Sequence, residues 1–527
     1  MRNALYYGDN LDVLRDSIAS ESVDLIYLDP PFNSQASYNV LFKSPSTGDR
    51  SESQIEAFED TWHWGQESES AFDQVMRSGN TNTADLLRGM RSFLSDNDVM
   101  AYIAMMAVRL LELHRVLKPS GSLYLHCDPT ASHYLRLILD AIFGLKNFQN
   151  EITWKRRYAH SDGERYGNVA DNILFYTRSD RYTWHQAYQP YEEDYIETYY
   201  HYSDPDGRKW LSRSTTAPGG RGPIYLWNGH SRAWRYTQIN MQKLHDAGKL
   251  FYTKNGIPRF KQYFDEMPGM PAQNIWSDIK PLNSWMTEQL GYPTQKPVAL
   301  LERIVTASSN VGDTVLDPFC GCGTTIHAAQ KLGRQWLGID ITHLAIGLIE
   351  RRLKDAFPGI AFDVHGTPTD LDGARDLASR DKYQFQWWAV SLIDAQPYGG
   401  KKKGADGGID GLIYFRSDAK TTERAIVSVK GGGVSVPMVR DLKGVLDREK
   451  APIGVFLTLE APTRPMEKEA ASAGLYTLGD RQYPRLQIIT VEQALNGTKP
   501  AIPLIDTGAA FKRAAREAIN KQPKLDL

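Results

Sequence analysis

Cysteine is scarce in this 527-residue chain, which holds three, Cys127, Cys320 and Cys322. Three thiols exclude a disulfide framework and a four-thiolate zinc site. No apolar run approaches the roughly 20 residues that a membrane helix requires, and the first residues lack the apolar segment of a secretory signal. We therefore expect a soluble intracellular protein with no membrane partner.

An excess of charge of one sign is also lacking, since 61 Lys and Arg oppose 63 Asp and Glu. The formal net charge of −2 excludes a global positive field that would gather nucleic acid. Any contact with DNA must therefore come from local patches. Aromatic residues are plentiful, with 27 Tyr and 12 Trp. Such rings suit base stacking, but they fill protein cores more often.

The chain is long enough for three or four domains, and it begins with alternating strand and helix patterns. Residues 23–28 form a near-continuous apolar run, as buried parallel strands do, and residues 99–116 have helical spacing. A stretch rich in Tyr, Trp and basic residues interrupts the alternation at about 186–280, after which it resumes. The pattern predicts an α/β fold with a parallel-type sheet and an insertion.

The tetrapeptide Asp29-Pro30-Pro31-Phe32 directly follows the predicted strand at residues 23–28. An exocyclic amino group of a base is a poor nucleophile, because its lone pair is delocalised into the ring. The Asp29 carboxylate and the Pro30 carbonyl can accept its two hydrogens and turn it toward tetrahedral geometry. Two prolines make this frame rigid, and Phe32 offers a ring on which an extruded base can stack. On its own, the tetrapeptide is equally compatible with an ordinary Pro-rich turn.

A second motif runs from Asp317 through Gly321 and Gly323, directly after the predicted strand at residues 314–316. Glycines at a strand-to-helix turn let the backbone approach a nucleotide-like ligand closely. After the next predicted strand, Asp340 stands where a carboxylate can bind two ribose hydroxyls. Turn, helix, strand and acid in this order predict a site for a nucleotide-like cofactor.

In this order, the two motifs resemble those of the β-class of DNA amino-methyltransferases, which includes the modification subunits of type III restriction systems. In that class the catalytic motif precedes the target-recognition domain and the cofactor motif follows it, as here. Residues 7–11 resemble the family's acidic segment near the cofactor adenine, and residues 292–297 resemble the segment that closes over its methionine end. The resemblance covers roughly residues 1–357.

The resemblance implies a Rossmann-like fold, S-adenosyl-L-methionine as the methyl donor and a flipped base as the acceptor. It implies catalytic roles for Asp29, Pro30, Pro31 and Phe32. It assigns cofactor binding to Asp9, Lys296, Asp317, Phe319, Gly321, Gly323, Thr324 and Asp340. Asp with Phe, rather than Ser with Tyr, favours adenine N6 over cytosine N4. A glutamine- or RNA-methylating relative would more often show Asn in place of Asp29.

The C-terminal part resembles the Mrr-like branch of the PD-(D/E)xK restriction endonucleases. Asp410 and Lys430 match that family's pattern, which implies that Asp410 holds Mg²⁺ and that the lysine positions the attacking water. Ser428 stands where Glu or Gln is expected, and a hydroxyl is a poorer magnesium ligand than a carboxylate. Asp406 is a candidate for the missing metal ligand, as is Glu460.

The insertion stands where the family has its target-recognition domain. Its mixtures of basic and aromatic residues suit phosphate contacts and stacking on duplex DNA, with a solvated face as the alternative for each. These clusters are 208–210, 232–236 and 254–259. The expected domains are a catalytic half at 1–185, the target-recognition insertion at 186–280, a cofactor-binding half at 281–357, a linker at 358–378, an endonuclease-like domain at 379–497 and an extension at 498–527.

We therefore expect an adenine-N6 DNA methyltransferase of a restriction–modification system, with a nuclease domain in the same chain. The alternatives are cytosine-N4 methylation, a C-terminal domain that binds DNA or a partner chain without cleaving, and a DNA reader that uses the cofactor fold only for binding. The expected partner is double-stranded DNA, and a homodimer is left open. The expected location is the cytoplasm of a prokaryote, in association with the nucleoid.

Overall fold

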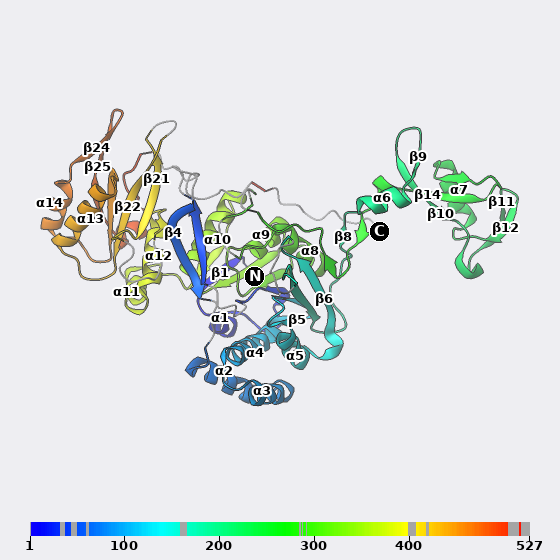
Figure 1. Cartoon of the computed structure of the whole chain (residues 1–527), viewed down its shortest axis with the longest axis horizontal. Coiled ribbons are helices and arrows are strands. Elements are labelled where there is room, and N and C mark those ends of the chain that lie inside the picture. The colour runs from blue at the N-terminus through cyan, green and yellow to red at the C-terminus, as the bar shows by residue number, and fades with distance from the viewer. Residues whose placement is uncertain are drawn as a thin grey trace. The chain divides into compact units, whose positions relative to one another are not determined.

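Figure 1 shows the computed structural model of the chain, which is the structure described below. It describes residues 2–31, 37–43, 50–59, 63–158, 166–283, 286, 288–290, 292, 294–398, 407–417, 421–503 and 516–517, with the backbone alone for 37–43 and 50–59. Phe32 and Asp406, both expected at functional sites, lie outside the described residues. The chain divides into two compact units, one spanning Gln186–Gln273 and the other comprising the remainder.

A nine-stranded mixed sheet is the centre of the larger unit. In spatial order its strands are β16 (Ile275–Trp276), β6 (Phe148–Lys155), β7 (Ala170–Thr177), β5 (Leu117–Cys127), β2 (Val23–Leu28), β17 (Thr314–Asp317), β18 (Gln335–Asp340), β1 (Ala4–Tyr7) and β19 (Asp363–His365). The six strands from β5 to β19 are parallel, while β7 is antiparallel to β5 and β6. This sheet confirms the α/β fold expected from the sequence.

Helices cover both faces of this sheet. One face packs against α1 (Asn10–Ser17), α2 (Gln66–Arg77), α3 (Thr81–Leu94), α4 (Asp98–Val116) and α5 (Ser132–Phe143). The other packs against α8 (Val298–Ser308), α9 (Thr324–Lys331) and α10 (His343–Ala356). The hairpin of β3 (Ser37–Lys43) and β4 (Arg50–Glu59) and the short 3-10 turn η1 (Leu145–Asn147) complete this region.

Helix α4 shows how the sequence sets these boundaries. The side chain of Asn97 caps its first turn by accepting a hydrogen bond from the amide of Met100. Apolar residues nearly all round the helix make it a buried element, and one basic side chain, Arg109, is buried among them. Among the described residues, no helix is both long and apolar enough to cross a membrane.

Parallel strands place the two sequence motifs at one edge of the sheet. Ile26 of β2 lies beside Leu316 of β17, and Asp317 lies beside Gly338 of β18. Strands β1, β2, β17 and β18 therefore all end at the same edge. The polar residues that end these strands or directly follow them meet there. This edge is the usual ligand site of an open α/β sheet.

The smaller unit lies within the predicted insertion. Its four-stranded antiparallel sheet contains β13 (Leu250–Tyr252), β14 (Pro258–Tyr263), β10 (Lys209–Ser214) and β9 (Tyr202–Ser203). Its other elements are α6 (Glu193–Tyr199), α7 (Gln238–Asp246), the hairpin of β11 (Ile224–Trp227) and β12 (His230–Ala233), the pair β8 (Tyr188–Gln189) and β15 (Met270–Pro271), and the 3-10 turns η2 (Pro218–Gly220) and η3 (Phe264–Glu266). None of these short elements has a periodicity that the sequence alone reveals.

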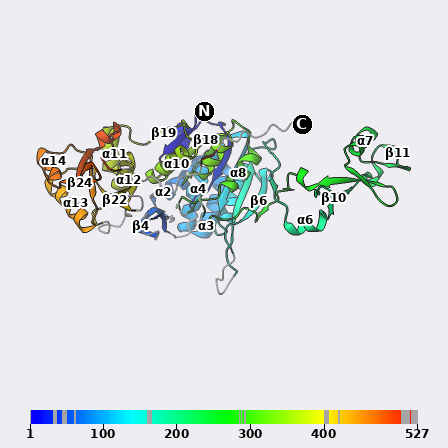
Figure 2. The same cartoon turned by 90° about the horizontal axis from the view of Figure 1, so that it is seen from above.

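A second sheet organises the C-terminal part of the larger unit. Its strands are β20 (Gln396–Pro397), β21 (Gly411–Arg416), β22 (Thr422–Lys430), β23 (Ile453–Thr458) and β26 (Leu486–Thr490). One face packs on α11 (Leu371–Arg380), α12 (Lys382–Leu392) and α15 (Val491–Leu495), and the other on α13 (Val436–Arg448) and α14 (Arg464–Ala471) (Figure 2). Strands β24 (Leu475–Leu478) and β25 (Arg481–Pro484) form a small hairpin.

The structure differs from the expected linker at residues 358–378. This segment contains β19, which pairs with β1 at the edge of the large sheet, and most of α11, which packs against the C-terminal sheet. Its polar, punctuated composition suggested an extended connection. A three-residue edge strand and a mostly exposed helix need few apolar residues, which is why the pattern did not reveal them.

Candidate functional site

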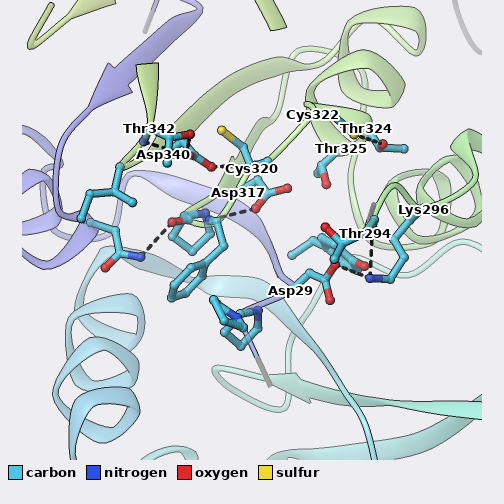
Figure 3. Close-up of a pocket in the computed structure, with 18 of the residues that line it drawn as sticks. Asp29, Thr294, Lys296, Asp317, Cys320, Cys322, Thr324, Thr325, Asp340 and Thr342 are labelled. Atoms are coloured by element: carbon cyan, nitrogen blue, oxygen red, sulfur yellow. Dashed lines mark hydrogen bonds and ion pairs between the residues drawn. The ribbon is translucent and has the colours of Figure 1, made fainter. Parts of the chain in front are cut away.

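A cavity opens at the edge where the four parallel strands end, with about 260 Å³ of interior space. Ten of the residues singled out in the sequence line it: Asp9, Asp29, Pro30, Pro31, Lys296, Asp317, Phe319, Gly321, Thr324 and Asp340. They come from five separate segments of the chain, which the sheet brings together (Figure 3). Four carboxylates line this cavity, and two cationic side chains, Lys296 and Arg109, line it as well.

Asp29 follows β2 and is held on one side by an ion pair. One of its carboxylate oxygens, Oδ2, accepts a hydrogen bond from the ammonium group of Lys296 (Figure 3). The other oxygen, Oδ1, is buried and has no hydrogen-bond partner in the described part of the chain. Lys296 was expected to bind the cofactor, and the structure places it against Asp29. The site therefore holds one carboxylate with an oriented oxygen and an unused acceptor.

The turn after β17 is tied to the end of β18 by the carboxylate of Asp340. Its Oδ2 accepts a hydrogen bond from the Gly321 amide at 2.9 Å, and its Oδ1 accepts from the Thr342 amide and hydroxyl, each at 2.9 Å. Gly321 and Gly323 both have positive φ, 48° and 73°, which glycine adopts without steric cost. Gly323 does not line the cavity but immediately precedes α9.

Arg109 is a functional residue of this edge that the sequence motifs do not include. Its guanidinium donates two hydrogen bonds to the carboxylate of Asp9, at 2.7 and 3.0 Å, and one from Nε to Oδ1 of Asn10 at 2.6 Å. Asn10 in turn donates to the Pro318 carbonyl at 2.8 Å. This chain of bonds joins the segment after β1 to the turn after β17. An arginine in the middle of the apolar helix α4 was the one sequence signal that could have found it.

We expect Arg109→Met to destabilise the protein by about 3 kcal/mol, because it leaves Asp9 and Asn10 without their buried partner. Arg109→Lys should recover less than half of this loss, since an ammonium group cannot make the same forked contacts. Urea unfolding measures both. Arg77→Met removes an exposed arginine with a 4.0 Å ion pair and is the control, with an expected effect below about 1 kcal/mol. Equal effects at the two positions would contradict this account.

Burial raises the pKa of Asp317 to about 7. The protonated form of Asp317 is therefore favoured in the folded chain. Its contribution to the free energy of unfolding is complete below the usual carboxyl pKa and is lost as the pH rises to and through 7. We expect the melting temperature of the unliganded protein to fall between pH 5 and pH 8. Asp317→Asn should raise it at both pH values, and by clearly more at pH 8 than at pH 5, as measured by differential scanning calorimetry. An identical pH dependence in the variant would contradict this account.

A second cluster of predicted residues lies in the C-terminal domain, where β22 ends. Oδ2 of Asp410 accepts hydrogen bonds from the Ser428 hydroxyl at 3.2 Å and the Val429 amide at 2.6 Å. Nζ of Lys430 lies 3.1 Å from Oγ of Ser428 and 4.0 Å from Oδ2 of Asp410. The structure thus brings Asp410 and Lys430 together, as expected. Glu460 is half exposed and its side chain lies 4.0 Å from Arg375.

Models of known protein families match both the N-terminal and the C-terminal part of the chain. A family model described as DNA methylase matches residues 23–351, and one described as restriction endonuclease matches residues 377–483. Both matches confirm the resemblances found in the sequence. They also agree with the observed division between the nine-stranded and five-stranded sheets.

Three curated relatives carry similar sequences. Type II methyltransferase M.EcaI of Enterobacter cloacae is 31% identical over 48% of this chain and 57% of its own length. The Mod subunit of the type III restriction-modification enzyme StyLTI of Salmonella typhimurium is 28% identical over 63% of this chain and 50% of its own. DNA adenine methyltransferase YhdJ of Escherichia coli is 26% identical over 67% of this chain and 83% of its own. The chain thus spans about half the length of the first two relatives.

Proposed function

The chain belongs to the DNA methylase family, and from this premise we propose that it transfers a methyl group from S-adenosyl-L-methionine to the N6 amino group of an adenine flipped out of duplex DNA. The observation that carries the proposal is the free acceptor of Asp29. Asp29 lines the cavity, and its Oδ1 is buried without a hydrogen-bond partner among the described residues, while Lys296 holds the other oxygen.

The buried oxygen of Asp29 explains how an unreactive amino group becomes a nucleophile. Accepting one N–H of the base amine localises the nitrogen lone pair, and a desolvated carboxylate accepts more strongly than one in water. Pro30 and Pro31 line the same cavity, so the backbone that carries the second acceptor is confined. The ion pair with Lys296 fixes the orientation of the carboxylate. Phe32 as the stacking ring for the base remains a prediction.

The cofactor fits the acidic, nucleotide-type part of the cavity. When bound, S-adenosyl-L-methionine supplies an activated methyl group on a positively charged sulfonium. We assign the ribose hydroxyls to Asp340, whose oxygens retain acceptor capacity beside the Gly321 amide. Asp317, Phe319 and Thr324 line the adjoining wall. Asp9, held by Arg109, lies at the end assigned to the cofactor adenine.

Two features support adenine over cytosine as the target base. The motif has Asp and Phe rather than Ser and Tyr, and one relative that matches 67% of this chain is named a DNA adenine methyltransferase. The test is nucleoside mass spectrometry of unmethylated plasmid DNA after incubation with the protein and S-adenosyl-L-methionine. We expect N6-methyldeoxyadenosine. N4-methyldeoxycytidine alone would replace the proposal with its alternative, and a DNA without either product would refute it.

We further propose duplex DNA as the macromolecular partner, consistent with a prokaryotic enzyme acting at the nucleoid. A homodimer is a separate expectation, which analytical ultracentrifugation of the purified chain tests. Neither expectation rests on the cavity itself, because the cavity is built from residues of one chain.

A second candidate activity, magnesium-dependent DNA cleavage, is favoured by the approach of Asp410 and Lys430 in the endonuclease-like domain. The described residues fit Mg²⁺ poorly: Asp410 is the carboxylate at this site, and Ser428 occupies the position beside it. In the described part of the chain, no group of three or more His, Cys, Asp or Glu side chains is placed to hold a metal ion. Mg²⁺ prefers six oxygen ligands, several of them carboxylate or water.

We therefore expect the wild-type chain to nick DNA weakly with Mg²⁺ and Ser428→Glu, which adds a carboxylate, to nick at least about tenfold faster. Asp410→Ala in either background should abolish the activity. Agarose gels of supercoiled plasmid measure both. Ser428→Ala, which adds no ligand, is the matched control. If Ser428→Glu cleaves no better than Ser428→Ala, the site is not a degenerate metal site.

A further inference from the structure

The smaller unit, residues 186–273, carries eleven Lys and Arg residues against nine Asp and Glu residues. All eleven cations lie between residues 207 and 263, a stretch in which Asp246 is the one acidic residue. Five of these cations are exposed and make no ion pair or hydrogen bond through their side chains with any described residue: Lys209, Arg221, Arg232, Lys243 and Lys254. Unpaired cations of one sign favour a polyanion as the partner of this unit.

The β11–β12 hairpin adds an exposed face with a different character. Successive residues of a strand point to opposite faces, so Tyr225 and Trp227 point to one side and Ile224 and Leu226 to the other. Residues paired directly across the hairpin share a face. The aromatic pair packs on the core around Trp234. The outer pair is 74% and 66% exposed. We call Ile224, Leu226 and the exposed Ser231, which pairs with Leu226, the outer face of the hairpin.

The hairpin is held rigidly at its tip. Asn228 and Gly229 form the turn with positive φ, 43° and 80°, as tight two-residue hairpin turns require. The Asn228 side-chain amide donates to the carbonyl of Gly256 at 2.7 Å, and Nε2 of His230 donates to the carbonyl of Asn255 at 2.8 Å. These bonds tie the tip to the β13–β14 turn, which also carries Lys254. The outer face is therefore presented without a large loss of entropy on binding.

We propose that the outer face of the hairpin contacts base edges in the major groove of the substrate DNA, while the five unpaired cations contact its phosphates. A two-stranded ribbon fits the major groove, where apolar side chains contact thymine methyl groups and a serine hydroxyl can hydrogen-bond a base edge. Phosphate contacts fix the register of the protein, and base contacts select the sequence. The inference rests on the proposed function, since it takes DNA as the substrate.

Duplex DNA suits this surface better than a second protein chain. The core of a protein–protein interface is depleted of charged residues. Its apolar area is also larger than that of two exposed aliphatic side chains. Here Arg221 precedes the hairpin by three residues, Arg232 lies on β12, and the tip touches the turn that carries Lys254. Cations thus flank a small apolar face on several sides.

The experiment compares two double variants of the full chain, after the methylated site has been found by sequencing DNA that the wild type has modified. Binding is measured on a duplex with this site and on one with the site scrambled, across salt concentrations. We expect Ile224→Ser with Leu226→Ser to lose about tenfold of the preference for the site while the salt dependence is unchanged. Arg221→Gln with Lys254→Gln should keep the preference, and its log–log salt slope should fall by about two.

Leu145→Ser is the control, because this leucine is 77% exposed and lies outside the smaller unit. An unchanged site preference in the hairpin variant would overturn the proposal. So would a hairpin variant whose sole defect is reduced self-association in ultracentrifugation, since the outer face would then contact a second copy. Failure of the proposed function is distinguishable, because the wild type itself would then leave DNA unmethylated.

Discussion

Asp29→Ala is expected to lower the rate of methyl transfer by about 10³-fold or more, while affinity for S-adenosyl-L-methionine and for DNA changes little. The variant removes a buried carboxylate oxygen that has no hydrogen-bond partner among the described residues, on a side chain that lines the cavity. Positioned groups of this kind typically contribute 10²- to 10⁴-fold to a rate. Single-turnover transfer of a labelled methyl group measures the rate, and equilibrium titration measures the two affinities.

Asp24→Ala is the matched control for this loss. Asp24 lies on β2, the strand that Asp29 follows, and it also forms an ion pair with a lysine, Lys118, at 2.8 Å, but it does not line the cavity. We expect this variant to lose stability and to keep methyl transfer within a few-fold of the wild type at a temperature where both are folded. If Asp29→Ala retains transfer, or if the two variants lose it equally, the role given to Asp29 is wrong.

Gly323→Asp is expected to abolish measurable cofactor binding, with a loss of at least about 100-fold in affinity. A Cβ at this position would lie 2.8 Å from Cγ1 of Ile349 in α10, and the φ of 73° is strained for any residue with a side chain. Relief of this clash must displace the turn that carries Gly321 and the start of α9. Shifts of about 1 Å in a binding site commonly cost two orders of magnitude. Isothermal titration with S-adenosyl-L-methionine measures the effect.

Gly333→Asp separates backbone strain from damage to the site. Gly333 has the same φ of 73° and follows α9 at its other end, where a Cβ would meet Cγ1 of Val311 at an ordinary 3.5 Å. Both variants should lose stability, because both force a left-handed conformation on a non-glycine residue. Only the change at Gly323 should remove cofactor binding. Normal affinity in Gly323→Asp would refute the assignment of this turn to the cofactor.

The strand ends explain why so much of the site was predictable from sequence. Asp29 and Asp317 each stand at or just after a largely apolar strand, and parallel strands with helical connections must end at a common edge. Local pattern therefore implied a long-range meeting of residues almost 300 positions apart. Asp340 followed from the same argument, one strand further along the sheet.

Contacts that depend on tertiary packing were not predictable in this way. Arg109 reaches Asp9 across 100 positions of sequence, and nothing in the helical pattern of α4 specifies its partner. Lys296 was expected beside the cofactor, yet its ammonium group pairs with Asp29, because the segment that carries it folds over the end of β2. The β11–β12 hairpin was not predicted because β11 alternates exposed aliphatic with half-buried aromatic residues and β12 is His-Ser-Arg-Ala, so neither has the pattern of a core strand.

The most direct test of the central claim is the stoichiometry of methyl transfer by the purified full-length chain. The protein is incubated with S-adenosyl-L-methionine labelled in its methyl group and with unmethylated duplex DNA, and both products are counted. The account predicts label in the DNA and an equal amount of S-adenosyl-L-homocysteine, both lost in Asp29→Ala. A chain that binds the cofactor and the DNA but leaves the DNA unlabelled would contradict it.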